Sequence, residues 1–450
     1  MLLMAGIFFY RPATAPLQAQ KPGDRTEELA LPKEFCLENG LKVYLLPYSW
    51  PRLTTVVLGI KVGAADETPD TSGHLHLLEH CLLFRQSHLM EKQRLYRTIK
   101  EFGLYYNAHT EQDLMLFEIC LPAEYLLSGL HLLKQVAFSF NITEEGLEKE
   151  KKVILKELQD IQRDPLRVGL AKAYELVFPN TGYALPVYGQ PEVIRKANLS
   201  QLQTWHQKYF NPNNSALVVI GNFSPEDLEE DLKQMFSDLK AGATKVNRIA
   251  LNRQSLNSGQ LVELRMKVAD TYLVAALAGP EYNHPDRIGL DLLSEMLGYG
   301  LYPLLYSAFA SQTDLVSSIN LHYLTHDQAG LIFIILTTRV DKVQTVRRLL
   351  QNFFSQLATF NYSKEDYFPQ EGLILDFLQG GKSRLRWTSE KMMENPLLLA
   401  RALAKHLLLA TERQKTDYLQ TLDSLNSSDM RKIARKYLSR GQVAWVVIKP

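Results

Sequence analysis

The pattern of apolar and polar positions predicts an α+β protein, in which strands and helices alternate along the whole chain. Short apolar or alternating runs predict strands at 41–46, 54–62, 215–220, 272–278 and 443–447. Residues 105–121 are expected to lie in one further strand segment. Longer runs with a helical period predict helices at 89–102, 123–138, 147–161, 170–178, 199–209, 225–239 and 286–297.

The second half of the sequence repeats the order of the first, which predicts two related domains. The segment 291–295 can be laid on 76–80, and 436–447 echoes 208–219. This offset of roughly 215 to 230 residues is too long for a solenoid repeat and suits a duplicated domain. We expect domains at 31–240 and 259–450, joined by a linker of small and polar residues at 241–258.

The first 30 residues are expected to form a leader or a mobile arm outside both domains. Residues 1–10 are apolar and small residues follow them, as in an export signal, but no basic residue precedes the apolar run. An export signal and an unfolded leader both stay open, and the sequence does not decide the compartment. No run reaches the ~18 apolar residues of a membrane-spanning helix.

The composition is that of a globular protein with a sizeable core. The 450 residues are 46% hydrophobic and 22% charged, with a formal net charge of +1. The length is sufficient for two or more domains. Near-neutral charge argues against nucleic acid or an acidic membrane surface as a partner. Cys36, Cys81 and Cys120 lack metal-ligand spacing, and their odd number excludes a complete disulfide framework.

The segment 76–80, His-Leu-Leu-Glu-His, carries the clearest chemical signal in the chain. On a helix, His76 and His80 lie one turn apart on the same face, and Glu79 lies beside them. The surrounding segment is almost entirely apolar, so the helix is expected to be buried, and buried ionisable groups need a partner. A divalent metal is one such partner, since this order of residues is that of the inverted zincins. Two histidines satisfied by neighbouring backbone or water are the alternative.

Two glutamates in the predicted helix 147–161 complete the expected metal site. Glu150 and Glu157 lie two turns apart on or beside its apolar stripe, whereas the lysines lie toward the charged side. Catalytic zinc takes three protein ligands, so Glu157 is the expected third ligand. Glu150 is expected to orient the ligands from behind. The alternative is a pair of solvated glutamates at the margin of the stripe.

Taken together, these residues resemble the M16 family of inverted-zincin metallopeptidases. The resemblance covers most of the chain after about residue 35 and, by size, points to the half-length branch, which is similar to mitochondrial processing peptidase. It implies two mostly antiparallel sheets packed by helices, together forming half of a four-domain clamshell. It also implies one Zn²⁺ per chain, and Asn107 and Ala108, within Asn-Ala-His-Thr, on an edge strand that pairs with substrate backbone.

The resemblance has one departure, in the second half of the chain. Active members usually carry an arginine and a tyrosine that hold the substrate over the zinc. The corresponding stretch here, 309–317, has Ala310 and Ser317 in their places. We therefore expect a heterodimer with a zinc-less M16 chain that supplies the pair. A homodimer with weak or altered activity is the alternative.

The expected reaction is hydrolysis of a peptide bond in an extended segment. Zinc held by His76, His80 and Glu157 would activate a water molecule and polarise the scissile carbonyl. Glu79 would act as the general base and pass the proton to the departing amine. A non-catalytic M16-like assembly subunit is the main rival, and a zinc-dependent hydrolase of non-peptide substrates is a third candidate.

Overall fold

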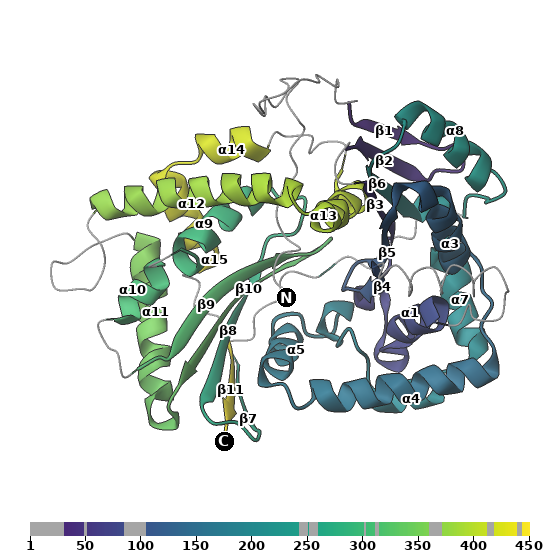
Figure 1. The fold of residues 1–450 in the computed structure, drawn as a ribbon. Coiled ribbons are helices and arrows are strands. Elements are labelled where there is room, and N and C mark those ends of the chain that lie inside the picture. The colour runs from purple at the N-terminus through teal and green to yellow at the C-terminus, as the bar shows by residue number, and fades with distance from the viewer. Residues whose placement is uncertain are drawn as a thin grey trace.

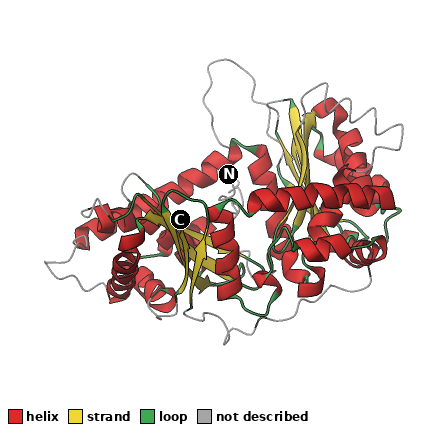
Figure 2. Ribbon diagram, turned by 90° about the horizontal axis from the view of Figure 1, so that it is seen from below, coloured by secondary structure: helices red, strands yellow, loops and turns green. Residues whose placement is uncertain are grey.

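The computed structural model describes residues 31–48, 52–84, 105–242, 251, 260–300, 303–310, 315–359, 371–411, 418–438 and 443–450. The leader expected at 1–30, the helix expected at 89–102 and most of the linker expected at 241–258 lie outside these residues. Two sheets, each flanked by helices, make up the described part (Figures 1 and 2). The α+β class predicted from the sequence is confirmed.

The first sheet has six strands in the order β1-β2-β6-β3-β5-β4. Strands β2 and β6 run parallel, and the other neighbours are antiparallel. The central strand β3 is buried along almost its whole length because helices cover both faces of the sheet. The strand bounds are β1 Lys33–Cys36, β2 Lys42–Pro47, β3 Leu53–Ile60, β4 Tyr105–Thr110, β5 Met115–Pro122 and β6 Ser215–Gly221.

The second sheet repeats this topology with five strands in the order β7-β11-β8-β10-β9. Its first and last strands in the sequence, β7 and β11, pair in parallel, as β2 and β6 do in the first sheet. The repeated order read from the sequence is therefore present in the strand connections. The bounds are β7 Leu261–Arg265, β8 Thr271–Gly279, β9 Ser318–Thr325, β10 Gly330–Thr338 and β11 Ala444–Lys449.

The expectation of one strand segment over 105–121 is wrong, because β4 and β5 form a hairpin. The backbone N–H of Glu111 donates to the carbonyl of Leu114 at 2.8 Å and closes the turn. The polar triplet at 111–113 interrupts the apolar alternation and is the sequence signal for this turn. The hairpin matters for function because it leaves β4 at the edge of the sheet.

Helices fill the space around both sheets. In the first half, α1, α3, α4 and α7 build the main core against one face of the first sheet. Within the described ranges, no helix combines the length and the apolarity that crossing a bilayer requires. The helix bounds are α1 His74–Phe84, α3 Leu126–Phe138, α4 Glu144–Ile161, α5 Pro165–Val177, α6 Pro191–Lys196, α7 Leu199–Tyr209, α8 Pro225–Phe236, α9 Arg287–Gly298, α10 Leu304–Ala310, α11 Val343–Thr359, α12 Glu371–Met393, α13 Pro396–Leu409, α14 Tyr418–Ser424 and α15 Ser427–Tyr437.

The two halves exchange one helix each. Helix α5 of the first half packs on β8 and β11, and helix α13 of the second half packs on β3 and β6 (Figure 1). Gly59 in β3 permits the approach of α13, because a Cβ atom there would lie 2.8 Å from a methyl carbon of Leu408. Each sheet is thus completed by a helix from the other half.

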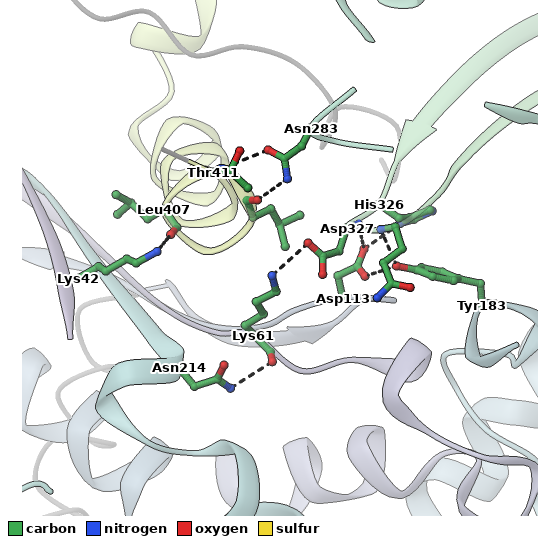
Figure 3. Close-up of polar contacts among 12 residues, drawn as sticks. Lys42, Lys61, Asp113, Tyr183, Asn214, Asn283, His326, Asp327, Leu407 and Thr411 are labelled. Carbon is green, nitrogen blue, oxygen red and sulfur yellow. Dashed lines mark hydrogen bonds and ion pairs between the residues drawn. The ribbon is translucent and has the colours of Figure 1, made fainter. Parts of the chain in front are cut away.

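A polar latch, defined as the buried Asp113, Tyr183 and His326 with the partly buried Lys61 and Asp327, joins the β4–β5 hairpin to the β9–β10 turn (Figure 3). The Asp113 carboxylate accepts hydrogen bonds from the Tyr183 hydroxyl at 2.7 Å and the Asp327 backbone N–H at 3.1 Å. Nδ1 of His326 lies 3.2 Å from the same carboxylate, and Lys61 pairs with Asp327 at 3.0 Å. Because β4 continues directly into this hairpin, the latch ties the edge strand to the second half.

We expect Asp113→Ala to lower the free energy of unfolding by about 3 kcal/mol, because it leaves several buried donors without their acceptor. Urea denaturation followed by circular dichroism would measure the change. Asp341→Ala, which removes an exposed pair with Arg339, is the control and should change stability by less than about 0.5 kcal/mol. Equal stability losses in the two variants would show that the latch contributes nothing beyond a surface ion pair.

Candidate metal centre

Helix α1 carries His76, Glu79 and His80 into the core of the first half. A short loop precedes it, and the Glu67 carboxylate in this loop accepts the backbone N–H groups of Gly73 at 2.8 Å and Leu75 at 2.7 Å. These bonds satisfy donors at the helix start that have no partner within the helix. Glu67 was not singled out from the sequence. Its signal was an acidic residue shortly before a helix that lacks an N-cap side chain.

The imidazole rings of His76 and His80 lie side by side, as their spacing predicts. Their ring centroids are 4.7 Å apart and the rings are nearly perpendicular. The side chain of His76 is 7% exposed and that of His80 is 12% exposed. Burial lowers the pKa of His76 to about 3, and the neighbouring His80 adds to this shift. Burial also lowers the pKa of His80 to about 4. Both rings are therefore neutral at pH 7, which is the form that binds metals.

Helix α4 brings Glu157 to these two rings. Its carboxylate oxygen lies 3.9 Å from Nε2 of His76 and 3.7 Å from Nε2 of His80. Glu150, two turns earlier on α4, lies on the other side of the His80 ring, 3.5 Å from Nδ1. Its side chain is only 6% exposed, whereas that of Glu157 is 36% exposed. The helix begins with Thr143 as its N-cap, whose side chain accepts the Gly146 N–H.

The donor set fits a zinc ion. The candidate ligand atoms of His76, His80 and Glu157 all lie within 4.8 Å of one another. Zinc bonds of 2.0–2.2 Å at tetrahedral angles place ligand atoms about 3.4 Å apart. The two histidine–glutamate distances, 3.9 and 3.7 Å, are larger by a few tenths of an ångström, and the two histidine nitrogens lie within 4.8 Å of each other, so the three side chains have to draw together around an ion. Two imidazole nitrogens and one carboxylate leave a fourth position open, as in catalytic zinc sites. Glu150 is positioned to accept the Nδ1 proton of His80, the usual arrangement behind a ligating histidine.

Glu79 faces the edge strand from the buried side of α1. Its carboxylate accepts a hydrogen bond from the Thr110 hydroxyl at 2.5 Å. Burial raises the pKa of Glu79 to about 7, against which the Thr110 hydrogen bond acts. Thr110 is the last residue of β4, so the strand and the carboxylate are directly connected.

Asn107 and Ala108 lie on β4, the outermost strand of the sheet. They point to opposite faces, as neighbours on a strand do: Ala108 packs in the core, and the Asn107 amide donates to the Tyr105 hydroxyl at 3.3 Å. The structure thus places both residues on an edge strand next to the α1 helix. The second-half stretch with Ala310 and Ser317 is only partly described, since 311–314 lie outside the described residues.

An arginine of the second half contacts side chains of β4 and β5. Arg401 on α13 forms a two-pronged ion pair with the fully buried Glu118 at 2.5 and 2.6 Å. The same guanidinium lies 2.9 Å from the Tyr105 hydroxyl and 2.9 Å from Nε2 of His109. Sequence analysis missed both charged partners. An isolated glutamate inside the apolar strand 115–122 was the available signal for Glu118, whereas nothing local marked Arg401.

Models of known families match both halves of the chain in order. Residues 49–190 match the model described as insulinase, peptidase family M16, and residues 196–367 match the model described as peptidase M16 inactive domain. The chain is 24% identical to zinc protease PqqE of Helicobacter pylori over 92% of each chain. It is 20% identical to a probable mitochondrial-processing peptidase subunit beta of Arabidopsis thaliana, over 92% of this chain and 77% of that protein.

Solved structures give the same fold. The crystal structure of a protease from Helicobacter pylori superposes with a TM-score of 0.83 at 21% identity, covering 94% of this chain and all of that one. The peptidase M16 inactive domain from Pseudomonas fluorescens has a TM-score of 0.80 at 15% identity, over 94% of this chain and 98% of that one. Together, the matched models, their order along the chain and the two-sheet fold show that this chain belongs to peptidase family M16.

Proposed function

We propose that the chain is a zinc-dependent endopeptidase that hydrolyses extended peptides or unfolded polypeptide segments. The observation that carries the proposal is the convergence of His76, His80 and Glu157 from two helices. The position of Glu79 between these residues and an open strand edge adds to it. The relatives named zinc proteases support zinc dependence in the family.

In this proposal His76, His80 and Glu157 hold the zinc, with Glu150 orienting His80. Zinc, when bound, supplies Lewis-acid polarisation and lowers the pKa of water. An extended substrate would add to β4 through main-chain hydrogen bonds, because β4 is the last strand of the first sheet among the described residues. Glu79 would accept the proton of the attacking water and deliver it to the departing amine. Thr110 holds the Glu79 carboxylate at the end of the strand where the substrate would lie.

We further propose that the working unit is a heterodimer with a zinc-less M16 chain. Ala310 and Ser317 stand where active members usually carry an arginine and a tyrosine. A partner chain could supply these groups from across a shared four-domain chamber. The relative named as a processing peptidase subunit shows that family members occur as subunits.

A non-catalytic assembly subunit is the second candidate, favoured by the same two substitutions. The burial of His76, Glu79 and Glu150 argues against it, because a scaffold gains nothing from withdrawing these ionisable groups from water without a metal. A hydrolase of non-peptide substrates would use the same ligands, but the edge strand beside Glu79 favours a peptide.

We expect Glu79→Gln to bind zinc with unchanged affinity and to lose casein hydrolysis by about 10²–10⁴-fold, because the amide cannot accept the proton. His80→Ala should lose both zinc and activity. Zinc content measured by atomic absorption, together with turnover of labelled casein, would separate the two effects. If the glutamine variant turns over casein at the wild-type rate, Glu79 is not the general base.

We expect Glu150→Gln to weaken zinc binding by about 10–100-fold, because the neutral amide no longer anchors the His80 ring as a carboxylate does. Competition against a chromophoric chelator would measure the affinity. Glu145→Gln, an exposed change in the first turn of the same helix, is the control and should bind zinc like the parent. Equal affinities for all three proteins would mean that Glu150 only fills space.

We expect the zinc-loaded chain to hydrolyse casein at least about 10-fold faster once its co-purifying M16 partner is added, since one lost oxyanion donor costs about 10²–10³ in rate. Size-exclusion chromatography with assays of each fraction would test this. Full activity of the isolated chain as a homodimer would contradict the heterodimer.

A further inference from the structure

An aromatic side chain from a third segment completes the surroundings of the histidines. The ring of Tyr188 packs edge to face on the imidazole of His76, with centroids 5.2 Å apart. Tyr188 is half-buried and packs against the core of the first half. Burial raises the pKa of the Tyr188 hydroxyl; the Arg167 charge opposes this shift, and the Glu157 and Glu79 carboxylates add to it.

The backbone fixes Tyr188 in this position. The adjacent Gly189 approaches Gly73, at the start of α1, so closely that a Cβ atom on Gly73 would lie 2.6 Å from the Gly189 Cα. Both glycines adopt positive φ angles, which other residues rarely accept. The backbone N–H of Gln190 also donates to the carbonyl of Ser72 at 3.2 Å. The turn that carries Tyr188 is therefore fastened to the helix that carries His76.

Arg167 lies against the ring of Tyr188. Its guanidinium is 5.7 Å from the centre of the Tyr188 ring, within the range of a cation–π contact. Arg167 lies in the first turn of α5. Asp164 is the N-cap of this helix, and its side chain accepts the Arg167 backbone N–H. Burial raises the pKa of Glu157, and the Arg167 charge opposes this shift.

A purely structural role accounts poorly for this arrangement. Asp164 and Arg167 are each 41% exposed and 3.5 Å apart, and such surface pairs contribute little to stability. A phenylalanine would pack on His76 as well as a tyrosine does. Tyr188 and Arg167 add a hydroxyl and a guanidinium near the candidate metal ligands. Those are the groups that Ala310 and Ser317 cannot provide from the second half.

We propose that Tyr188 and Arg167 form a substrate-holding pair on this chain. In this assignment, which rests on the proposed peptidase function, both groups donate hydrogen bonds to main-chain carbonyls of a peptide paired with β4. The contacts are independent of substrate sequence, because every peptide carries these carbonyls. The chain therefore binds unfolded polypeptide by itself, and a partner chain adds to a site that already holds its substrate.

The test is binding, measured without turnover. In the zinc-loaded Glu79→Gln background, fluorescence anisotropy of fluorescein-labelled casein gives the dissociation constant. Tyr188→Phe and Arg167→Gln should each weaken binding by about 10-fold, the size of one lost hydrogen bond to a well-placed acceptor. The double variant should lose less than the product of the two single losses, because the residues are in contact and act together.

Matched controls come from the same chain. Arg163→Gln removes an equal charge one turn before Arg167, from a side chain that is 78% exposed. Tyr306→Phe removes a hydroxyl from an exposed tyrosine on α10. Both should bind casein like the parent. Zinc affinity of the Tyr188 and Arg167 variants should also equal that of the parent.

Two results would overturn the assignment. Unchanged casein binding in both single variants would exclude substrate contact, and a parallel loss of zinc affinity would show that the pair only supports the metal ligands. If the parent Glu79→Gln chain binds no casein at all, the proposed peptidase function fails together with this inference. Parent binding with unchanged variants would overturn the substrate-holding pair alone.

Discussion

The cost of burying ionisable groups is the constraint on which the rest of this structure depends. His76, Glu79 and Glu150 are almost fully withdrawn from water inside an apolar core. Burial alone moves the histidines toward their neutral form and Glu79 toward its protonated form. A dication at the three converging donor atoms would reverse this penalty, because it stabilises the carboxylates while requiring neutral imidazoles. A cation bound at the cluster would thus give the fold a physical reason to keep these residues.

The site also depends on the second half, although all the candidate ligands come from the first. Strand β4 is an edge, and edge strands have few partners to hold them in register. Here the hairpin after β4 is tied to the β9–β10 turn through Asp113 and His326, and Arg401 braces β4 from the exchanged helix α13. Both contacts are made by side chains, and among the described residues no further strand pairs with the outer side of β4. The second half therefore helps to position this edge strand, although the candidate ligands all come from the first half.

The proximity of the two histidines and the two glutamates was predicted from the sequence because much of its signal is local. The spacing of His76 and His80, and that of Glu150 and Glu157, follows from helical periodicity alone, and helices α1 and α4 bring these residues together as expected. The sequence failed where the partner lies far away along the chain. Arg401 meets Glu118 across 283 residues, and Tyr188 reaches His76 through a turn whose only marks are Gly189 and Gly73. The hairpin at 111–114 was missed because the strands on either side share one alternating pattern. Contacts of this kind depend on topology, which periodicity does not encode.

The duplicated helix α9 shows how the same position is stabilised without a metal. Asp291 and Glu295 occupy the places of His76 and His80 in the repeat and are similarly buried. Here the compensating groups come from the chain itself: the Tyr418 hydroxyl donates to Asp291 at 3.2 Å, and Arg384 pairs with Glu295 at 3.1 Å. Arg287 adds a partly buried positive charge that acts on Asp291. The second half thus stabilises its buried carboxylates by donors of the chain itself, whereas the first half presents two neutral imidazoles and a half-exposed carboxylate to one point. Helices α1 and α9 thus bury ionisable groups at equivalent positions but stabilise them differently. Of the two, α1 has the donor arrangement that suits a metal ion.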